Sequence, residues 1–309
     1  MAVLVDGNWL NQYVAPQLLA EFKNDKDDFI GVLKGAPRQA ITADGIRFNK
    51  LINNVGFIVD NSAEFTAKKM DGKKAFVEWE KYDTEPTSVD DAEIRSLNYD
   101  KRSAVRVKHT EAFKRGIRDH VMWKLAPDDD TNEDMPVMRT TGPDDGTGRK
   151  RLTFVDLVKY LEKIEVLNLG NPEENYMVLC PEHRTDLIID RDSASYFSNK
   201  NIFFDPKTGE VQSVMGFKFF RNNAVLAYDN LGAKLAKGAA LTSTDRRASL
   251  FFHAANTVYH LDSVKILYKP ETTDTKSADP TSEFRTQTYG LVDRIQEIGV
   301  GAIVSGIVV

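Results

Sequence analysis

Several features that define common protein classes are missing from this chain of 309 residues. Its one cysteine, Cys180, excludes an internal disulfide framework and any metal site held by several cysteines. The longest apolar run, residues 298–309, has 12 residues, whereas a helix needs about 20 to span a membrane. No Lys or Arg precedes Lys23, so we expect no secretory signal. Together these absences favour a folded soluble protein.

Residue arrangements typical of enzymes are also missing. The five histidines, at positions 109, 120, 183, 253 and 260, lack the spacing of paired metal ligands. Cys180 and His183, a thiol and an imidazole three residues apart, suggest a nucleophile and its base, but Cys180 ends an apolar segment where a small buried residue is expected. We therefore interpret Cys180 as structural and predict no catalytic residue, no metal site and no cofactor.

The segment 127–151 carries fragments of two ligand-binding motifs. Residues 142–150 resemble a phosphate-binding loop, but Thr147 stands where the motif requires its second glycine. Residues 128–132 resemble the start of a calcium loop, but Glu133 and Arg139 occupy its glycine and glutamate positions. With three prolines, three glycines and seven acidic residues, the segment is predicted to be a long, mobile, solvated loop.

The charge balance is slightly acidic, with 46 Asp and Glu against 41 Lys and Arg, a net charge of −5. A protein whose main task is to grip nucleic acid normally carries clustered basic residues, so that function is disfavoured. The length fits one large domain or two of ordinary size.

Helical and strand patterns alternate irregularly along the chain. Thr110 is placed to cap one helix, and Thr153 and Asp156 fit a capping box at the start of another. We expect helices over 110–125, 154–164 and 182–196, a buried strand over 176–180, extended segments over 211–225, 258–268 and 286–309, and a polar turn over 279–285. This order predicts an α+β fold rather than repeated βαβ units.

The segment 73–109 has the pattern of a long charged hairpin. Val77 and Trp79 alternate with glutamates in its first half, and Val105 and Val107 alternate with basic residues in its second half. From 73 to 108, 16 of 36 residues are charged, so little of it is expected to be buried in its own subunit. The chain before it is predicted to form an extended arm.

This order of elements resembles the major capsid proteins of tailed double-stranded DNA bacteriophages, which have the Hong Kong 97 type fold. The runs that carry the resemblance are 77–86 with 103–109 (similar to the family's E-loop), 110–125 (its spine helix), 152–167 with 176–187 (its axial domain), and 209–217 with Tyr289 and Gly290 (its later strands). None of these runs is a strict signature. The specificity lies in their joint order.

The resemblance implies an α+β fold divided into five segments. They are 1–72, the N-terminal arm and start of the peripheral domain; 73–109, the E-loop; 110–150, the spine helix and following loop of the peripheral domain; 151–255, the axial domain; and 256–309, late axial strands and the return to the peripheral domain.

The resemblance further implies a structural coat protein, not an enzyme, that self-assembles into an icosahedral shell around the DNA genome of a tailed phage. The implied partners are other copies of the chain in hexamers and pentamers, a separate scaffolding protein, a portal protein and packaged DNA bound without sequence specificity; a decoration protein stays open. The implied location is the virion capsid, after assembly in the host cytoplasm. An encapsulin-like nanocompartment shell and a soluble cysteine-dependent enzyme are the alternatives.

The predicted hairpin offers a candidate surface for contact between subunits. Residues 78–93 carry seven acidic side chains and one basic, whereas residues 95–108 carry five basic and one acidic. Exposed ion pairs within one hairpin contribute only about 0–1 kcal/mol each, so this polarity is better explained as a patch complementary to a neighbour. The residues predicted to make the contact are Trp79, Tyr82, Asp90, Asp91, Glu93, Arg95 and Arg102.

Overall fold

The computed structural model describes residues 29–51, 59–60, 72–90, 101–192, 216–223, 226–273, 275–277 and 280–308. The α-helices in these ranges are α4 (Lys101–Leu125), α5 (Phe154–Val166) and α6 (Pro181–Asp192). The strands are β1 (Gly45–Leu51), β2 (Gly72–Glu78), β3 (Glu80–Asp83), β4 (Thr87–Asp90), β5 (Val137–Arg139), β6 (Arg149–Lys150), β7 (Asn175–Leu179), β8 (Lys218–Arg221), β9 (Ala227–Tyr228), β10 (Arg246–His253), β11 (Thr257–Leu261), β12 (Lys265–Lys269), β13 (Thr281–Arg294), β14 (Val300–Val304) and β15 (Gly306–Ile307). The predicted α+β class is confirmed. None of the helices in the described ranges has the length and hydropathy needed to cross a membrane.

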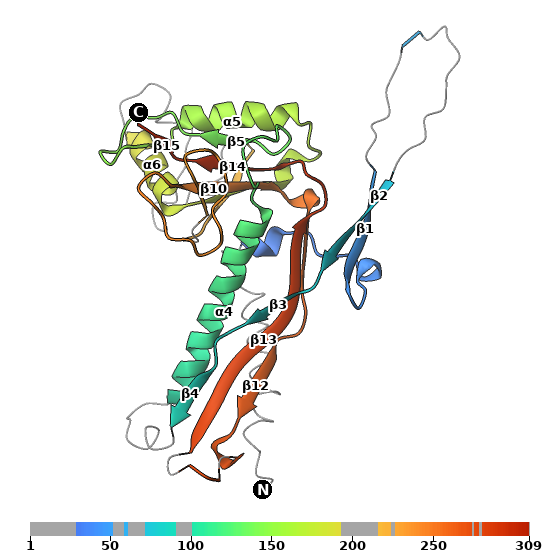
Figure 1. Cartoon of the computed structure of the whole chain (residues 1–309). Helices are drawn as coiled ribbons and strands as arrows, with labels where there is room; N and C mark the ends of the chain where they lie inside the picture. Colours follow the sequence, from blue (N-terminus) through green and yellow to red (C-terminus); the bar gives the residue numbers. More distant parts are fainter. Residues whose placement is uncertain are drawn as a thin grey trace.

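The upper body in Figure 1 is built on a six-stranded sheet. Its strands follow the order β5-β14-β10-β7-β8, with β9 paired to one end of β10. The pairs β14–β5 and β7–β8 are parallel, and the others are antiparallel. Leu157 of α5 and Leu187 of α6 belong to one core cluster, so both helices cover the same face of the sheet.

Alternate residues of the central strand β10 enter two different cores. Phe251 packs under α5, with its ring centre 5.8 Å from that of Tyr160. Leu250 and Phe252 point to the opposite face, into a cluster that includes Leu125 at the end of α4. Because successive side chains of a strand point to opposite faces, burial on both faces favours consecutive apolar residues, as in the run Leu250–Phe252 of β10.

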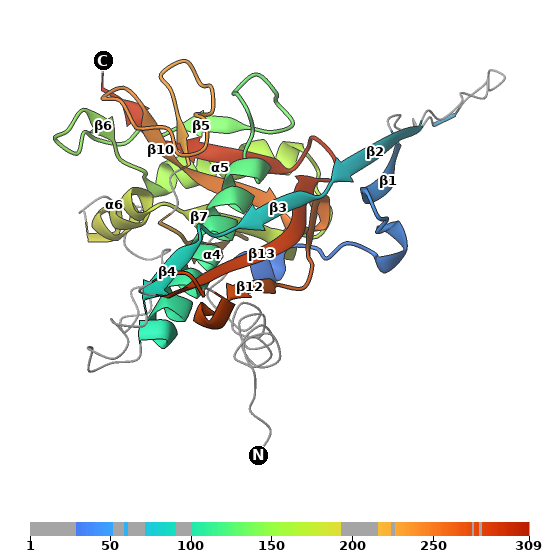
Figure 2. The same ribbon diagram turned by 60° about the horizontal axis from the view of Figure 1, so that its bottom comes forward.

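The lower, elongated part of the molecule is organised by β13, which has 14 residues. One edge of β13 pairs with β11 and β12, and the other edge pairs with β3 and β4. Phe284, Thr286 and Thr288 are buried on the face that α4 covers, whereas Glu283 and Tyr289 are exposed on the opposite face. Figure 2 shows α4 lying along this sheet on the way from the upper body to its far end.

Helix α4 is longer than the sequence predicts and corrects the second half of the expected hairpin. It begins at Lys101, so the strand expected over 103–109 was wrong. Thr110 lies inside the helix, where its hydroxyl donates to the carbonyl oxygen of Arg106 at 3.0 Å instead of capping an end. Apolar residues recur every four positions from Phe113 onward, and Val105 fits the same spacing. The buried polar residue His109 lies between them and interrupts the apolar stripe.

The hairpin of the structure lies earlier in the chain than expected. Strand β2 pairs with β1 over seven residues, from Gly45 opposite Glu78 to Leu51 opposite Gly72. The arm expected over 1–72 therefore contains one strand of the hairpin, and the expected E-loop over 73–109 contains only the other. Strands β3 and β4 pair with β13 and belong to the lower sheet.

The segment 127–151 is more structured than its composition predicts. It contributes β5 to the upper sheet and pairs β6 with β15. Arg149 donates to the two carboxylate oxygens of Asp186 at 2.6 and 2.8 Å and to Asp145 at 2.7 Å. Charge pairing thus fixes the tip of a segment that was expected to be mobile, although Gly146 and Gly148 do form turns with positive φ.

The remaining predicted elements have mixed outcomes. The capping box of α5 is confirmed, because Thr153 and Asp156 each accept a hydrogen bond from the backbone N–H of the other. The strand β7 and the start of α6 are confirmed. The polar turn over 279–285 was wrong, since β13 begins at Thr281. The last strands of the chain, β14 and β15, lie in the upper body.

Candidate assembly surface

The strands β1 and β2 project from the molecule, and among the described residues they pack against the rest of it at their root (Figures 1 and 2). At the root, Ile46 is fully buried against Val258 of β11 and Leu291 of β13. Gly45 lies at φ 156°, and a side chain there would collide with the carbonyl oxygen of Val77. The two strands form a separate two-stranded sheet, and such a sheet is at best marginally stable by itself in water.

Trp79 fixes the root of the hairpin instead of facing outward. Its indole N–H donates to the carbonyl oxygen of Thr42 at 3.2 Å, and its ring meets His260 edge-to-face with the ring centres 5.5 Å apart. The side chain is half-buried in the same cluster as Ile46. Trp79 therefore contributes apolar contact area within its own subunit.

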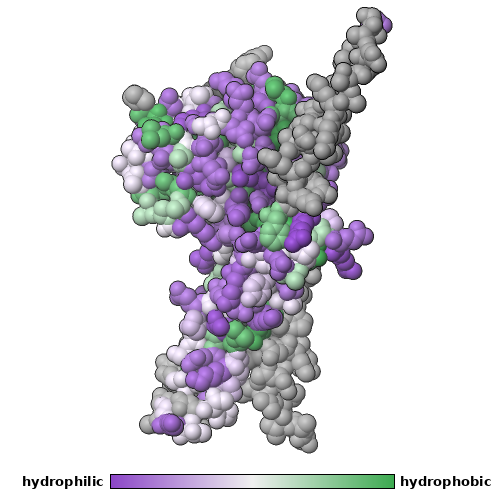
Figure 3. All heavy atoms as spheres, turned by 45° about the vertical axis from the view of Figure 1, so that its right-hand side comes forward, coloured by the Kyte–Doolittle hydropathy of each residue, from purple (hydrophilic) through white to green (hydrophobic). Residues whose placement is uncertain are grey.

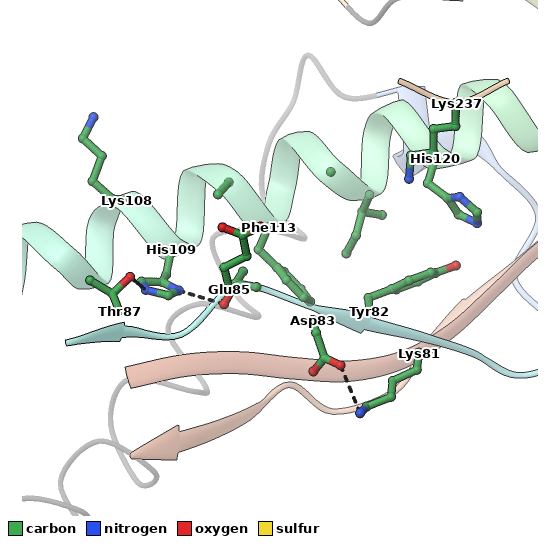
Figure 4. A pocket seen from close by; sticks show the side chains of 14 residues that line it. Lys81, Tyr82, Asp83, Glu85, Thr87, Lys108, His109, Phe113, His120 and Lys237 are labelled. Carbon is green, nitrogen blue, oxygen red and sulfur yellow. Dashed lines mark hydrogen bonds and ion pairs between the residues drawn. The ribbon is translucent and has the colours of Figure 1, made fainter. Parts of the chain in front are cut away.

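A groove of about 550 Å³ separates α4 from the strands β3 and β4. Figure 4 shows Tyr82 beneath α4 with its ring toward His120, and the two ring centres are 5.4 Å apart. Lys81 and Asp83, on either side of Tyr82, point away from α4 and form an ion pair at 3.1 Å. The alternation of a strand thus turns the ring of Tyr82 toward α4 and the charged side chains of Lys81 and Asp83 away from it.

The carboxylate of Glu80, at one end of this groove, is hydrogen-bonded to several side chains. It accepts hydrogen bonds from His120 at 2.5 Å, Tyr82 at 3.1 Å and Lys124 at 3.3 Å. Burial by itself raises the pKa of Glu80, but the hydrogen bond and charge of His120, with the charge of Lys124, outweigh it and lower the pKa to about 2. The carboxylate is held ionised and ties β3 to α4.

His109 occupies the middle of the groove as a neutral link. Its ring nitrogens lie 2.7 Å from the hydroxyl of Thr84 and 2.9 Å from that of Thr87, and its ring meets Phe284 edge-to-face. Burial lowers the pKa of His109. These two hydrogen bonds fasten α4 to the strand β4 and to the segment that precedes it.

The predicted contact residues divide into two groups. Trp79 and Tyr82 are half-buried within the subunit, at the hairpin root and in the groove. Asp90 lies at the end of β4 and Arg102 in the first turn of α4, and the structure describes their backbone alone. Asp91, Glu93 and Arg95 lie outside the described residues. The structure therefore brings no inter-subunit patch together from this set, and its role stays a prediction.

Cys180 and His183 form no catalytic pair. His183 bonds through its two ring nitrogens to the hydroxyls of Ser249 and Ser305, at 2.7 and 2.9 Å. Burial raises the pKa of the Cys180 thiol to about 11 and lowers the pKa of His183 to about 4. A reactive thiol needs a lowered pKa, so the environment of Cys180 opposes that chemistry and agrees with a structural role.

The acidic loop that resembles a calcium site is held by a lysine. Asp128 pairs with Lys234 at 2.6 Å, and the same ammonium group donates to the carbonyl oxygens of Trp123 and Ala126 at the end of α4. Within the described ranges, no cluster of three or more His, Cys, Asp or Glu residues is arranged to hold a metal ion.

Comparison with solved structures identifies the fold. The chain aligns over 88% of its length with 86% of a chain from the capsid of the cyanophage P-SCSP1u, with a TM-score of 0.60 and 14% identity. It aligns over 88% with 84% of a chain from the mature capsid of bacteriophage PhiM1, with a TM-score of 0.56 and 13% identity. It aligns over 90% with 90% of a chain from the capsid of an empty gene transfer agent particle, with a TM-score of 0.60 and 10% identity. No family model and no curated protein matches the sequence.

The fold is therefore that of phage capsid proteins of the Hong Kong 97 type, as the resemblance in the sequence implied. At these identities the agreement concerns the arrangement of the chain. The order of elements along the sequence, rather than any motif, carries the likeness.

Sequence reasoning missed the first strand of the hairpin, and a signal for it was present. Over β1, Ile46 and Phe48 alternate with Arg47 and Asn49, which is the period-two pattern of a strand. Many prolines and glycines nearby favoured an irregular arm instead. The half-buried Glu80 and the buried His109, which join α4 to the sheet, carried no sequence signal of their own.

Proposed function

We propose that this chain is a major capsid protein, a structural subunit that self-assembles into the icosahedral shell around the double-stranded DNA of a tailed bacteriophage. The observation that carries the proposal is the fold, shared with phage and gene transfer agent capsid structures over about nine tenths of both chains. These neighbours are structural proteins, which supports a role in assembly rather than in turnover.

The projecting hairpin supplies the physical reason for assembly. Two strands without a third strand or a packed face gain little stability alone, and Phe76 on β2 is 43% exposed. Packing against a neighbouring copy would bury this surface by the hydrophobic effect. Since the contact joins two different surfaces of identical chains, its repetition closes rings and, with the right geometry, shells.

In the terms of this fold, we assign the upper body with its six-stranded sheet to the axial domain and the lower sheet with α4 to the peripheral domain. The β1–β2 hairpin takes the part of the E-loop, and α4 that of the spine helix. Hexamers and pentamers, a separate scaffolding protein, a portal, a decoration protein and assembly in the host cytoplasm before enclosure in the virion belong to the same proposal. The closed, neutral surroundings of Cys180 leave a cysteine-dependent enzyme without support.

Deletion of the hairpin tests the proposal. Arg47 and Phe76 face each other across the strand pair, so a short turn joining them removes residues 48–75 while leaving Ile46, Val77 and Trp79 at the packed root in place. The variant is expected to fold, as judged by circular dichroism, and to sediment only as monomers or small oligomers. Closed shells from this variant would show that the hairpin is not needed for assembly. DNA in particles of the intact chain would separate a phage shell from a nanocompartment with protein cargo.

A further inference from the structure

A second groove, of about 610 Å³, lies at the root of the hairpin on the face of the lower sheet away from α4. Phe76, Trp79 and Tyr289 form its apolar walls. Phe76 is 43% exposed and Tyr289 is 39% exposed, so two aromatic rings remain open to solvent beside the half-buried indole. Figure 3 shows that the surface on the side of the hairpin is otherwise mostly hydrophilic, with small separate apolar patches.

The same groove is acidic. Asp44, Glu78 and Asp262 line it, and among the described residues no Lys or Arg does. Asp262 accepts a hydrogen bond from the backbone N–H of Ser263 at 2.8 Å, whereas Asp44 and Glu78 have no side-chain hydrogen bond or ion pair within the described ranges. Carboxylates among exposed aromatic rings suit a guanidinium group, because this group forms ion pairs with carboxylates and stacks on aromatic rings.

One wall already shows this type of contact. The guanidinium carbon of Arg47, on β1, lies 5.4 Å from the ring centre of Phe76. Arg47 does not line the groove, so it leaves the carboxylates of Asp44 and Glu78 to be matched by another positive group.

The matching surface is the outer side of α4. The helix contains eight basic and two acidic residues, a net charge of +6 in a chain of net charge −5. Lys108, Glu111 and Arg115 are exposed on the side turned away from the sheet. Lys108 pairs with Glu111 at 3.3 Å. Arg115 is near enough to Asp119 of the same helix for its charge to lower the pKa of that carboxyl, but within the described part of the chain it forms no ion pair with N···O within 4 Å.

Arg115 cannot reach the groove of its own subunit, because α4 and the groove lie on opposite faces of the same sheet. We propose that Arg115 of one copy docks in the groove of Asp44, Glu78 and the three aromatic residues of a second copy. The proposal rests on the proposed shell function and names one contact within it. It is a head-to-tail contact, since each copy offers both surfaces, and therefore suits a ring of subunits.

A charge exchange tests the pairing. The groove variant D44K/E78K and the helix variant R115E are each expected to lower the yield of closed shells about tenfold, because like charges then meet across the contact. The combined variant D44K/E78K/R115E restores attraction with the signs exchanged, and its yield should return to within about twofold of the parent. Electron microscopy and light scattering measure shell yield, and circular dichroism checks folding.

Control variants separate this contact from general effects of charge. E162K/E165K reverses two exposed carboxylates on α5, far from the groove in the fold, and should assemble like the parent. If D44K/E78K does not fold, D44N/E78Q is used in its place, because it keeps the shape of both side chains and removes their charge. This variant should still lower the yield of closed shells, and its yield should depend less on salt concentration than that of the parent.

The results also separate this contact from the proposed function. If the parent and the groove variants form shells equally, or if the combined variant assembles no better than the worse of its two components, the pairing of Arg115 with the groove is wrong while the shell function stands. If the parent itself forms no shells, the proposed function fails instead.

Discussion

His183 makes the stability of the upper body depend on pH in a predictable way. It is fully buried on α6 between the hydroxyls of Ser249 and Ser305. Burial lowers its pKa from the ordinary 6.5 to about 4, the nearby charge of Asp186 opposes the shift, and that of Arg149 adds to it. The folded protein therefore keeps this imidazole neutral at pH values where the unfolded chain has already protonated it.

The sign and size of the effect follow from proton linkage. Between pH 6.5 and pH 4 the unfolded state binds one more proton at this site than the folded state does, so the free energy of unfolding falls as the pH falls. The interval from 6.5 to about 4 corresponds to about 3 kcal/mol. The stabilisation is complete above pH 6.5, declines through this range and is fully lost below about pH 4.

The assay is urea unfolding of the subunit, followed by circular dichroism at half-unit steps from pH 7.5 to 4. His183→Gln keeps a side chain able to bond to the two serines but removes the titration, so we expect the fall in unfolding free energy over this range to shrink by about 3 kcal/mol. Leu187→Ala, fully buried on the same helix, should lower stability by about 2–5 kcal/mol at every pH. If the glutamine variant loses stability with acid as steeply as the parent, His183 is not held neutral and the reasoning fails.

Three further predictions concern other contacts of the fold. Asp186→Ala leaves Arg149 half-buried beside one remaining carboxylate and should lower the free energy of unfolding by about 3–5 kcal/mol. Amide hydrogen exchange over residues 142–150 should become faster. Unchanged exchange there would show that the ion pair does not hold the segment. Gly301→Ala should lower stability by about 1–3 kcal/mol, since its methyl group would collide with the hydroxyl of Tyr160, and a melting temperature equal to that of the parent would contradict this. Glu80→Gln should remove the loss of stability that the parent shows between about pH 4.5 and 2, because the folded pKa lies below the unfolded one; acid titrations that coincide would refute it.

The sequence predicts best where a local signal and tertiary packing agree. The capping box at Thr153 and the apolar face that follows it define α5 without reference to the rest of the chain. The buried strand β7 is similarly marked by its continuous apolar run. Both elements lie in the upper body, where each face of the sheet has its own core.

Sequence-based prediction is least accurate where a polar residue is buried, or where a helix or strand depends on contacts with residues far away in the sequence. His109 interrupts the apolar stripe of α4, so the first two turns of the helix looked like an alternating strand. The hydrogen-bond partners of His109 are Thr84, directly after β3, and Thr87, at the start of β4. Both are placed by contacts with β13, through the backbone hydrogen bond of Thr84 to Thr286 and the pairing of Thr87 with Phe284. The hairpin is charged and exposed. The alternation of apolar and charged residues was recognised in β2, whereas the similar alternation in β1 was not.

The groove at the hairpin root could not be foreseen for the same reason. Asp44, Glu78 and Tyr289 are far apart in the chain and meet only because β2 and β13 lie together at the root. No local pattern links them.

Electron microscopy of the purified protein tests the central claim most directly. The chain is expressed alone and together with the genes adjacent to its own, and the particles are separated by sedimentation before imaging. We expect closed shells of uniform diameter whose reconstruction shows hexamers and pentamers, with the β1–β2 hairpin of each subunit lying on a neighbour. Compact monomers under every condition, or shells in which the hairpin contacts no other subunit, would contradict it.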